Sequence, residues 1–240
     1  HELKTGFSFR RDNLEERNIS IQYNQNYLQP TVLPENESPY HVYYKKNALQ
    51  YSAYIQDKME YSSMIMNLGV RYDAFVPKDS SIADLVYPQA GKSAASEKTM
   101  ISPRIGVSLP ITDTGIFHFS YGHFYQMPTL RNLYRESYFG AGLTPTVGNP
   151  DLKPEKTVLY EFGFQQQFGQ LIGMDLNLFY KDIRELLALQ NIRYDSPQYG
   201  PSNYDIYLNK DYGTSRGLTL SATKRYDPRS EERRVGKECR

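Results

Sequence analysis

Two arginines and two tyrosines cluster in one short stretch of the sequence: Arg131, Tyr134, Arg135 and Tyr138. An arginine offers a planar fork of donors to an anionic group, and a tyrosine ring can stack on an aromatic or cationic one. Placed on a loop, such a stretch can grip an anionic or aromatic ligand. The alternative is that these residues are simply the hydrophilic surface of a loop. We take the four residues as the candidate ligand contacts of this chain.

The sequence offers neither a catalytic constellation nor a metal site. Ser120 lies in Phe-Ser-Tyr-Gly, which lacks the glycine spacing of a nucleophile elbow. The four histidines show no His-x₃-His spacing, and no clustered carboxylates or cysteines accompany them. Hydrogen-bonded or solvated histidines are therefore the expectation. We predict no enzyme activity, no metal and no cofactor.

Charge and hydropathy narrow the class of protein. Lys and Arg number 28 against 27 Asp and Glu, and this balance argues against a nucleic-acid partner, which would require a basic surface. The mean hydropathy is −0.65, and no apolar run approaches the roughly 18 residues of a transmembrane helix. A membrane β-barrel remains compatible with this value, because only every second residue of its strands faces lipid.

Aromatic content favours strands. The chain has 22 Tyr and 11 Phe but no Trp. Tyrosine suits pleated strands and the girdles at membrane interfaces, where the ring is apolar and the hydroxyl is wet. A tyrosine-rich soluble β protein would have the same composition.

Both ends of the sequence carry expectations of their own. The chain begins at His1 without a signal peptide, so we expect its start to be processed or missing. Residues 229–240 resemble the conceptual translation of a sequencing adapter, with a basic solvated tail as the alternative. We therefore expect the natural sequence to run to about Pro228, and Cys239, the only cysteine, to have no disulfide partner and no redox role.

The hydrophobic pattern has a period of two. Between Met64 and Asp73, apolar residues occupy the even positions and mostly polar ones the odd positions, which a strand separates onto two faces. Phe179 breaks the polar face of one such segment. With residues 64–75, the alternation predicts about eight strands, the others being 3–10, 49–56, 102–109, 117–122, 158–165, 174–181 and 217–222.

The links between these strands alternate in length. Short links lie at 57–62, 111–115 and 168–171, and long links at 11–46, 76–100, 127–155 and 183–207. Compact soluble domains seldom carry loops beyond about 12–15 residues. Here the long links all fall on one side of an up-and-down meander, which is typical of outer-membrane barrels. A ten-residue strand of roughly 34 Å, tilted about 45°, also spans roughly the apolar band of such barrels.

These patterns predict an all-β fold. Residues 1–228 would form an antiparallel up-and-down transmembrane β-barrel segment, about eight strands of a larger barrel. Leu68, Val70, Phe162 and Leu176 would face hydrocarbon, and Asn67 and Gln165 the lumen. A soluble β-sandwich binding module is the alternative, but it would need a second sheet to cover the apolar face.

One motif has a clear stereochemical meaning. Pro150 and Pro154 fix φ near −65° and push the residues before them toward extended geometry. The result is a stiff, non-helical approach to a strand. Asp151 and Glu155 can accept local backbone hydrogen bonds there.

Several stretches, taken in order, resemble the barrel of TonB-dependent receptors. They cover roughly residues 47–225, and residues 43–75 are most similar to receptors of Bacteroidetes-type bacteria. The stretches are Tyr54–Lys58, Asn67–Asp73, Ser102–Gly106, Phe119–Pro128, Gly148–Glu155, Tyr160–Gly163 and Gly213–Leu220, with Asn209. In that family the Asn149–Glu155 motif is structural and leads from an extracellular loop into a strand; its members here are Asn149, Pro150, Asp151, Leu152, Pro154 and Glu155.

The resemblance implies active uptake across the bacterial outer membrane. A scarce ligand of the siderophore, haem, cobalamin, glycan or peptide class would bind at the extracellular face. The TonB complex would act through a plug domain, which would lie before His1, and outer-membrane lipid would surround the barrel. A passive porin-like barrel is the alternative within the same fold.

Overall fold

The chain forms one large curved sheet. The computed structural model describes residues 1–23, 30–86, 88, 91–140, 142–169 and 171–224. In spatial order the strands of the sheet are β1 (Glu2–Ile19), β4 (His41–Tyr61), β5 (Met64–Pro77), β8 (Lys98–Thr112), β9 (Gly115–Gln126), β11 (Glu155–Phe168), β12 (Ile172–Ser196), β13 (Gly200–Lys224) and β10 (Thr146–Val147).

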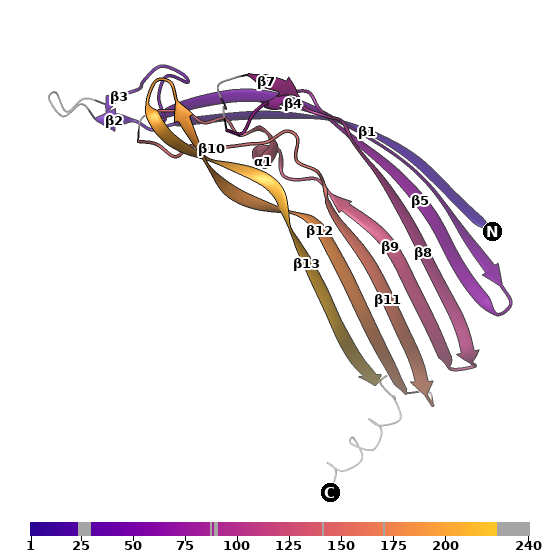
Figure 1. Ribbon diagram of the computed structural model, residues 1–240. Helices are drawn as coiled ribbons and strands as arrows, with labels where there is room; N and C mark the ends of the chain where they lie inside the picture. Colours follow the sequence, from indigo (N-terminus) through magenta and orange to yellow (C-terminus); the bar gives the residue numbers. More distant parts are fainter. Residues whose placement is uncertain (24–29, 87, 89–90, 141, 170, 225–240) are drawn as a thin grey trace, which may run out of the picture.

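Figure 1 shows this sheet as an open, gutter-like wall. The eight long strands pair antiparallel with their neighbours in the sequence, and the two-residue β10 adds in parallel to β13. The predicted antiparallel meander of about eight strands is confirmed. Over the part of the chain that the structure describes, no second sheet covers the convex face, so the sandwich alternative has no support. No helix among these residues is long and apolar enough to cross a membrane.

The links differ in length at the two ends of the wall. At one end β4 passes into β5 after Tyr61, and β8 into β9 through residues 113–114. At the other end, three long links carry small elements of their own. These are β2 (Gln22–Tyr23) with β3 (Pro30–Thr31), β6 (Ser80–Ile82) with β7 (Lys92–Ala94), and the helix α1 (Leu130–Tyr134) with β10.

The predicted long link at 183–207 is wrong. β12 and β13 instead continue as a paired hairpin up to Ser196 and Gly200. The register shifts between Ile183 and Leu187, where Glu185 has a φ of 60°. Beyond this β-bulge the alternation of apolar and polar residues changes phase. The sequence pattern therefore predicted that the strand ends there.

The predicted link at 11–46 is also too long. β1 runs on to Ile19 and β4 begins at His41, with Glu15 opposite Lys45 and Arg17 opposite Tyr43. Near this end of the wall the outward side chains of both strands are polar, and on the inward face apolar side chains such as Tyr44 and Ala48 mix with charged ones such as Lys46. The period-two signal therefore disappears although the pairing continues.

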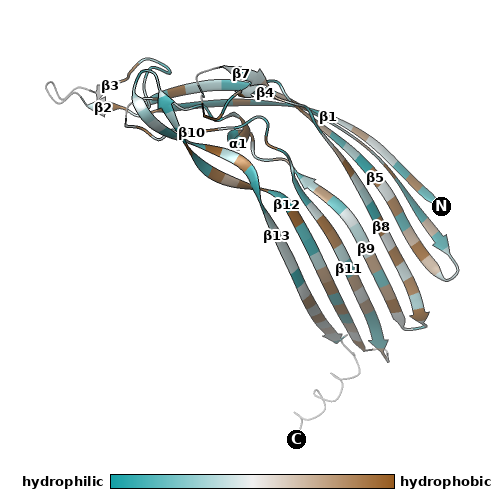
Figure 2. Cartoon of the chain, in the orientation of Figure 1, coloured by the Kyte–Doolittle hydropathy of each residue, from teal (hydrophilic) through white to brown (hydrophobic). Residues whose placement is uncertain are grey.

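The convex face is apolar, as the alternation predicted. Leu68, Val70 and Phe162 are 36%, 47% and 45% exposed, and Leu176 shares their face because it pairs with Phe164 and Leu220. One row of this face runs across five strands through Val107, Phe119, Phe162, Leu178 and Leu218. Figure 2 shows hydrophobic and hydrophilic residues alternating along the strands.

A row of tyrosines borders the apolar row on the side of the long links. Tyr121, Tyr160 and Tyr180 are register partners on β9, β11 and β12. Their ring centroids are 5.1 Å and 6.4 Å apart along the row. This arrangement is typical of the girdle in which tyrosines meet a membrane–water interface.

On the concave face, glycines make room for large side chains. Phe179, the apolar residue on a polar face, pairs with Gly217, and a Cβ on that glycine would lie 2.6 Å from the Phe179 ring. The His118 ring likewise crosses above Gly163 to reach Asn177 Oδ1 at 2.9 Å. Phe179 is therefore tolerated because its ring occupies the space left by a glycine.

Candidate functional site

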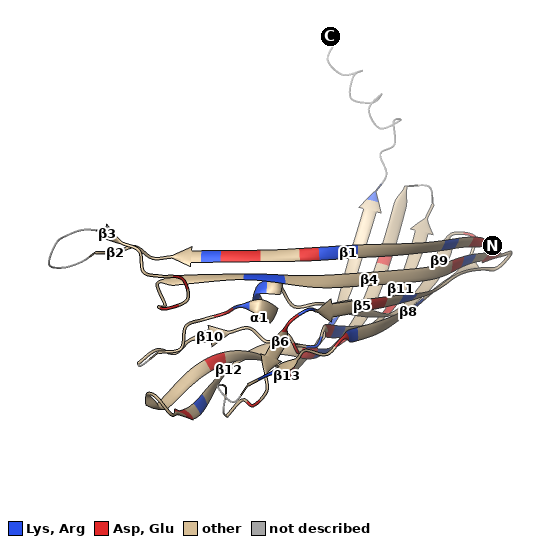
Figure 3. Cartoon of the chain, turned by 90° about the horizontal axis from the view of Figure 1, so that it is seen from above, with Lys and Arg blue, Asp and Glu red and all other residues tan. Residues whose placement is uncertain are grey.

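Helix α1 folds back onto the concave face at the end of the wall with the long links. It begins after Thr129, whose hydroxyl accepts from the backbone N–H of Asn132, and ends at Arg135. Figure 3 shows α1 and β10 between β4 on one side and β12 and β13 on the other. The long link 127–154 therefore fills the mouth of the gutter instead of extending away from it.

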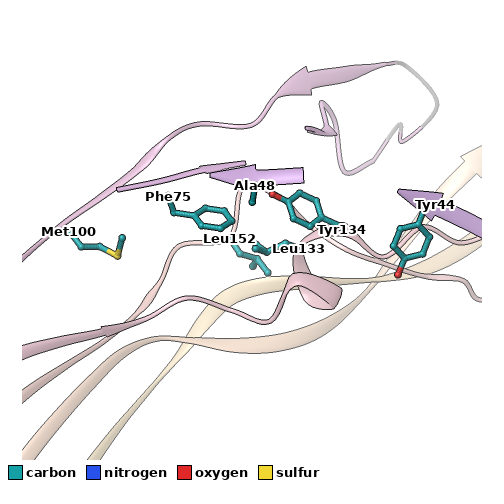
Figure 4. Packing of buried hydrophobic residues seen from close by; sticks show 7 residues of the cluster. All are labelled: Tyr44, Ala48, Phe75, Met100, Leu133, Tyr134 and Leu152. Atoms are coloured by element: carbon teal, nitrogen blue, oxygen red, sulfur yellow. The ribbon is translucent and has the colours of Figure 1, made fainter. Parts of the chain in front are cut away.

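The helix is held by a small hydrophobic cluster. Leu133 and Tyr134 are 0% and 2% exposed. Figure 4 shows them beside side chains of β4, β5, β8 and the link after α1; the cluster comprises Tyr44, Ala48, Phe75, Met100, Leu133, Tyr134 and Leu152. A helix of five residues has little stability in water by itself, so this burial is what fixes its position.

The four predicted ligand contacts lie in different surroundings. Tyr134 is buried in the cluster, and its hydroxyl has no hydrogen-bond partner among the described residues. Arg131 is exposed, with Nη2 3.4 Å from Glu16 Oε1. Arg135 and Tyr138 are half-buried, and within the described chain the Arg135 guanidinium forms no ion pair.

Three of the four residues line one hollow. It has a volume of about 240 Å³ and lies between link 127–154 and the ends of β1 and β4. Arg131, Arg135 and Tyr138 contribute to it, together with Glu16 and Tyr44. Tyr134 instead lines a neighbouring hollow of about 330 Å³, which Arg135 also reaches. The structure therefore brings Arg131, Arg135 and Tyr138 together and separates Tyr134 from them.

The acidic groups of this region are already engaged. Glu16 Oε2 accepts from the Tyr44 hydroxyl at 2.5 Å, and Lys46 Nζ lies 2.5 Å from Glu136 Oε1 and 3.0 Å from Asp79 Oδ2. Burial alone would lower the pKa of Lys46, but the hydrogen bonds and charges of Glu136 and Asp79 raise it. The Arg135 guanidinium is left as a positive group facing the hollow.

The Asn149–Glu155 motif fastens link 127–154 to β12 and β13. Asn149 Nδ2 donates to the Tyr207 carbonyl at 3.1 Å. From β13, Asn209 Nδ2 donates to the carbonyls of Lys153 and Glu185 at 3.0 Å and 2.8 Å. Its Oδ1 also accepts from the Lys153 N–H at 2.8 Å. Asn209 thus joins the motif to the bulge of β12.

Asp151 makes non-local contacts, contrary to the sequence prediction. Its Oδ1 accepts from the backbone N–H and the hydroxyl of Ser96 at 2.9 Å and 2.8 Å, and its Oδ2 accepts from Ser81 at 2.9 Å. The local backbone bond within the motif comes from Asn149, whose Oδ1 accepts from the Asp151 N–H. No hydrogen bond is found for the Glu155 carboxylate in the described residues. The carboxylate of Asp151 therefore ties link 127–154 to link 78–97.

A buried lysine completes this junction. Lys98 is 6% exposed, and its Nζ donates to the carbonyls of Ser96 and Pro150 and lies 3.2 Å from Asp151 Oδ1. Burial lowers the pKa of Lys98. Burial would raise the pKa of Asp151, but the donors from Ser96, Ser81 and Lys98 outweigh it and lower that pKa to about 2. The sequence contained no signal for Lys98 or Ser96, which lie more than fifty residues from Asp151 in the chain.

Each histidine has one hydrogen-bonded ring nitrogen in the described structure. His118 contacts Asn177, His123 Nε2 lies 2.7 Å from the Tyr121 hydroxyl, and His41 Nδ1 lies 2.7 Å from the Leu33 carbonyl. Among the described residues, no three His, Cys, Asp or Glu side chains gather where they could hold a metal ion.

Comparison with known proteins identifies the class. A curved antiparallel wall with an apolar convex face, a tyrosine row and long links at one end is the architecture of an outer-membrane barrel. The family model described as "TonB dependent receptor-like, beta-barrel" matches residues 1–231. The chain belongs to this family, whose members are outer-membrane proteins of Gram-negative bacteria.

Two curated proteins and a solved structure illustrate the relationship. TonB-dependent heme receptor A of Haemophilus ducreyi is 24% identical over 208 residues, covering 82% of this chain and 26% of that protein. The hemin receptor of Yersinia pestis is 28% identical over 140 residues, covering 54% and 19%. The structure of the copper transporter OprC superimposes with a TM-score of 0.61 at 16% identity, covering 94% of this chain and 33% of that one. The chain spans about a quarter or less of the length of these curated relatives.

Proposed function

We propose that this chain is part of the barrel of a receptor that takes up an iron-bearing ligand through the outer membrane in a TonB-dependent manner. The family match over residues 1–231 is the observation that carries this proposal. Haem is the ligand that the relatives favour, because two curated relatives are named as heme and hemin receptors. The TonB complex would act through a plug domain elsewhere in the receptor.

The hollow lined by Arg131, Arg135 and Tyr138 would be a contact for the arriving ligand. Arg135 supports this role because its guanidinium faces the hollow without an acidic partner in the described chain. An acidic group of the ligand, such as a haem propionate, would form a charge-assisted hydrogen bond with it. Tyr138 would add an aromatic face. Tyr134, buried among apolar side chains, would hold the helix in place.

The histidines give haem no obvious axial ligand in this part of the receptor. His118 and His123 are hydrogen-bonded to Asn177 and Tyr121, and His1 to Asp57. The His41 side chain is only 10% exposed. The hollow would therefore recognise the charged and aromatic edge of the ligand. Coordination of its iron, if the receptor provides it, would come from other residues.

A passive porin-like barrel is the rival function. It is less consistent with the structure because α1, β10 and the Asn149–Glu155 motif fold into the mouth and are fastened there by Asn149, Asn209 and Asp151. A mouth filled in this way restricts free diffusion.

The experiment uses the intact receptor in a host that lacks its own haem receptors. Growth on haem as the sole iron source is compared in the presence and absence of the host TonB protein, and after collapse of the proton-motive force. We expect growth only when TonB and the proton-motive force are both present. Equal haem uptake without TonB would establish the porin-like alternative, and TonB-dependent uptake of a different iron complex would replace haem as the ligand.

A further inference from the structure

Two acidic side chains line the hollow that Arg131 and Arg135 share, and they differ in their partners. Glu136 Oε1 lies 2.5 Å from the Nζ of Lys46, a cation that does not line the hollow. Glu16 Oε1 instead lies 3.4 Å from Arg131 Nη2, which belongs to the hollow itself. Glu16 therefore determines how much positive charge the hollow presents.

The Glu16 carboxylate is held in place from the side of the strands. Glu16 and Tyr44 are register partners on β1 and β4, and the Tyr44 hydroxyl donates to Glu16 Oε2 at 2.5 Å. Tyr44 is only 4% exposed. Burial, and then the hydrogen bond and the charge of Glu16, raise the pKa of Tyr44, so its hydroxyl stays protonated and keeps donating. The carboxylate is thereby fixed beside Arg131.

The two arginines of the hollow are in different states as a result. The backbone N–H of Arg135 donates to the Arg131 carbonyl, so both side chains leave the chain within one turn. Glu16 compensates the charge of Arg131, whereas Arg135 forms no ion pair within the described part of the chain. The hollow therefore presents one uncompensated positive charge to a ligand, although two cations line it.

A second acid group on the same ligand would meet other surroundings than the first. The first acid group would bond the Arg135 guanidinium. The second would have to displace the Glu16 carboxylate from Arg131, which also breaks the bond from Tyr44, or lie beside that carboxylate and be repelled by it. Either route costs free energy that a neutral group does not incur.

We propose that Glu16 sets the charge selectivity of the hollow, which accepts one acid group and disfavours two adjacent ones. The inference rests on the proposed role of the hollow as a ligand contact, and it names the residue that limits which ligands fit. Of two acid groups on a ligand, one would bind at Arg135 and the other would stay outside the hollow. Glu16 acts through Arg131 and is a positioning residue.

The neighbouring Glu15 provides a matched control. Its Oε1 also accepts from a tyrosine hydroxyl of β4, that of Tyr43 at 3.2 Å, and its Oε2 lies 3.4 Å from Lys45 Nζ. Because successive residues of a strand point to opposite faces, Glu15 points away from the hollow that Glu16 lines. The variant E15Q therefore removes the same charge and the same kind of ion pair outside the hollow.

The test measures the binding of benzoate and isophthalate to the intact receptor by saturation-transfer NMR at one ionic strength. The two probes share a ring and carry one and two carboxylates. The quantity compared is the ratio of the benzoate Kd to the isophthalate Kd in wild type, E16Q, E15Q and E16Q/R131Q. Glutamine at position 16 keeps an acceptor for the Tyr44 hydroxyl. If E16Q nevertheless fails to fold, E16D and E16N are compared instead, because they differ in charge.

We expect E16Q to raise this ratio severalfold, because Arg131 becomes free for the second carboxylate. E15Q should keep the wild-type ratio, and E16Q/R131Q should restore it, which a purely structural effect of E16Q would not do. In the substitute pair, E16N should have the higher ratio.

An equal ratio in E16Q and E15Q, or in E16D and E16N, would overturn the proposal. A raised ratio that persists in the double variant would overturn it too. The same holds if R135Q leaves the binding of both probes unchanged, since the hollow then takes no acid group. Haem does not enter these measurements, so the selectivity of the hollow and the uptake of haem can fail separately.

Discussion

Arg135 is the residue on which the ligand proposal depends most. Its guanidinium faces a hollow in which Glu16 is bonded to the Tyr44 hydroxyl and Glu136 lies against Lys46. A charge left without a partner in this way is available to a ligand. The neighbouring Tyr134 belongs to the same arginine–tyrosine stretch of the sequence, but its side chain is buried. Residue type alone therefore did not show which of the two residues lines the hollow with Arg131.

The first prediction concerns Arg135→Gln in the intact receptor. A hydrogen bond to a charged group contributes about 1.5–3 kcal/mol, so we expect binding of an acidic iron ligand to weaken about 10- to 100-fold. Equilibrium titration of the receptor with haem measures this. Arg193→Gln, an exposed arginine outside the hollow, is the matched control and should bind normally. Equal affinities for the two variants would remove Arg135 from the ligand site.

The second prediction concerns the junction of Asp151 with Ser96 and Lys98. Because the folded-state pKa of Asp151 is lowered from 3.8 to about 2, the charged carboxylate stabilises the folded link above the unfolded-state pKa. That contribution is lost as the pH falls from about 4 to about 2. Its size is about 1–2 kcal/mol, reduced by solvent screening because the carboxylate is 39% exposed.

The measurement is limited proteolysis of link 78–97 in the intact receptor. Asp151→Asn should increase cleavage there at neutral pH, and wild type should approach the variant only in strong acid. Asp113→Asn, an exposed carboxylate in the turn between β8 and β9 at the other end of the wall, is the control. A link equally protected in Asp151→Asn and wild type would contradict the junction's role.

The strands show which parts of the fold the sequence pattern predicts and which parts it does not. Within the apolar band, one face meets lipid and the other does not, so alternation predicted the β5 segment 64–75 correctly. Toward the long links the outward face becomes polar and the inward face mixes polar with apolar side chains, so the pairing of Glu15 with Lys45 leaves no periodic trace in the sequence. The bulge at Glu185 hid the upper parts of β12 and β13 for a different reason, because it shifts the phase of the pattern. Contacts such as Lys98 with Asp151 join distant links and have no local signal.

The third prediction tests the glycines of the concave face that make room for large side chains. Gly217→Ala places a Cβ 2.6 Å from the Phe179 ring, so the ring must move at a cost of about 1–3 kcal/mol. Gly173→Ala is a matched control on the neighbouring strand, where nothing lies within 4 Å of the new Cβ. The free energy of unfolding, from urea titration of the intact receptor in lipid vesicles, should fall only for Gly217→Ala. Similar values for both variants would mean that the ring does not depend on the glycine.

The fourth prediction tests the two faces of β5. Leu68→Arg introduces a charge into hydrocarbon and should destabilise folding into vesicles by about 2–4 kcal/mol, while Asn67→Arg on the concave face should cost little. The folding equilibrium of the intact receptor in lipid vesicles gives both values. A similar penalty at the two adjacent positions would reverse or remove the assigned facing.

At the scale of the whole molecule, the wall explains why the proposed ligand contacts lie at one end. The strands provide a rigid scaffold, and their apolar face fixes its level in the membrane. The predicted family and fold are confirmed by the match over residues 1–231 and by the open antiparallel wall. The predicted adapter-derived tail at 229–240 lies outside the described residues and stays a prediction. The fold alone does not determine which ligand binds, because the side chains that line the hollow would select it.

The central claim is that successive residues of a strand face lipid and the barrel interior in turn. Spin labels placed singly at positions 66–72 of the intact receptor in lipid vesicles test it directly, through collision with oxygen, which concentrates in hydrocarbon, and with a water-soluble nickel complex. Oxygen accessibility should peak at Met66, Leu68, Val70 and Tyr72 and fall at the positions between them. Uniform accessibility along β5, or oxygen maxima at Asn67 and Arg71, would contradict the account.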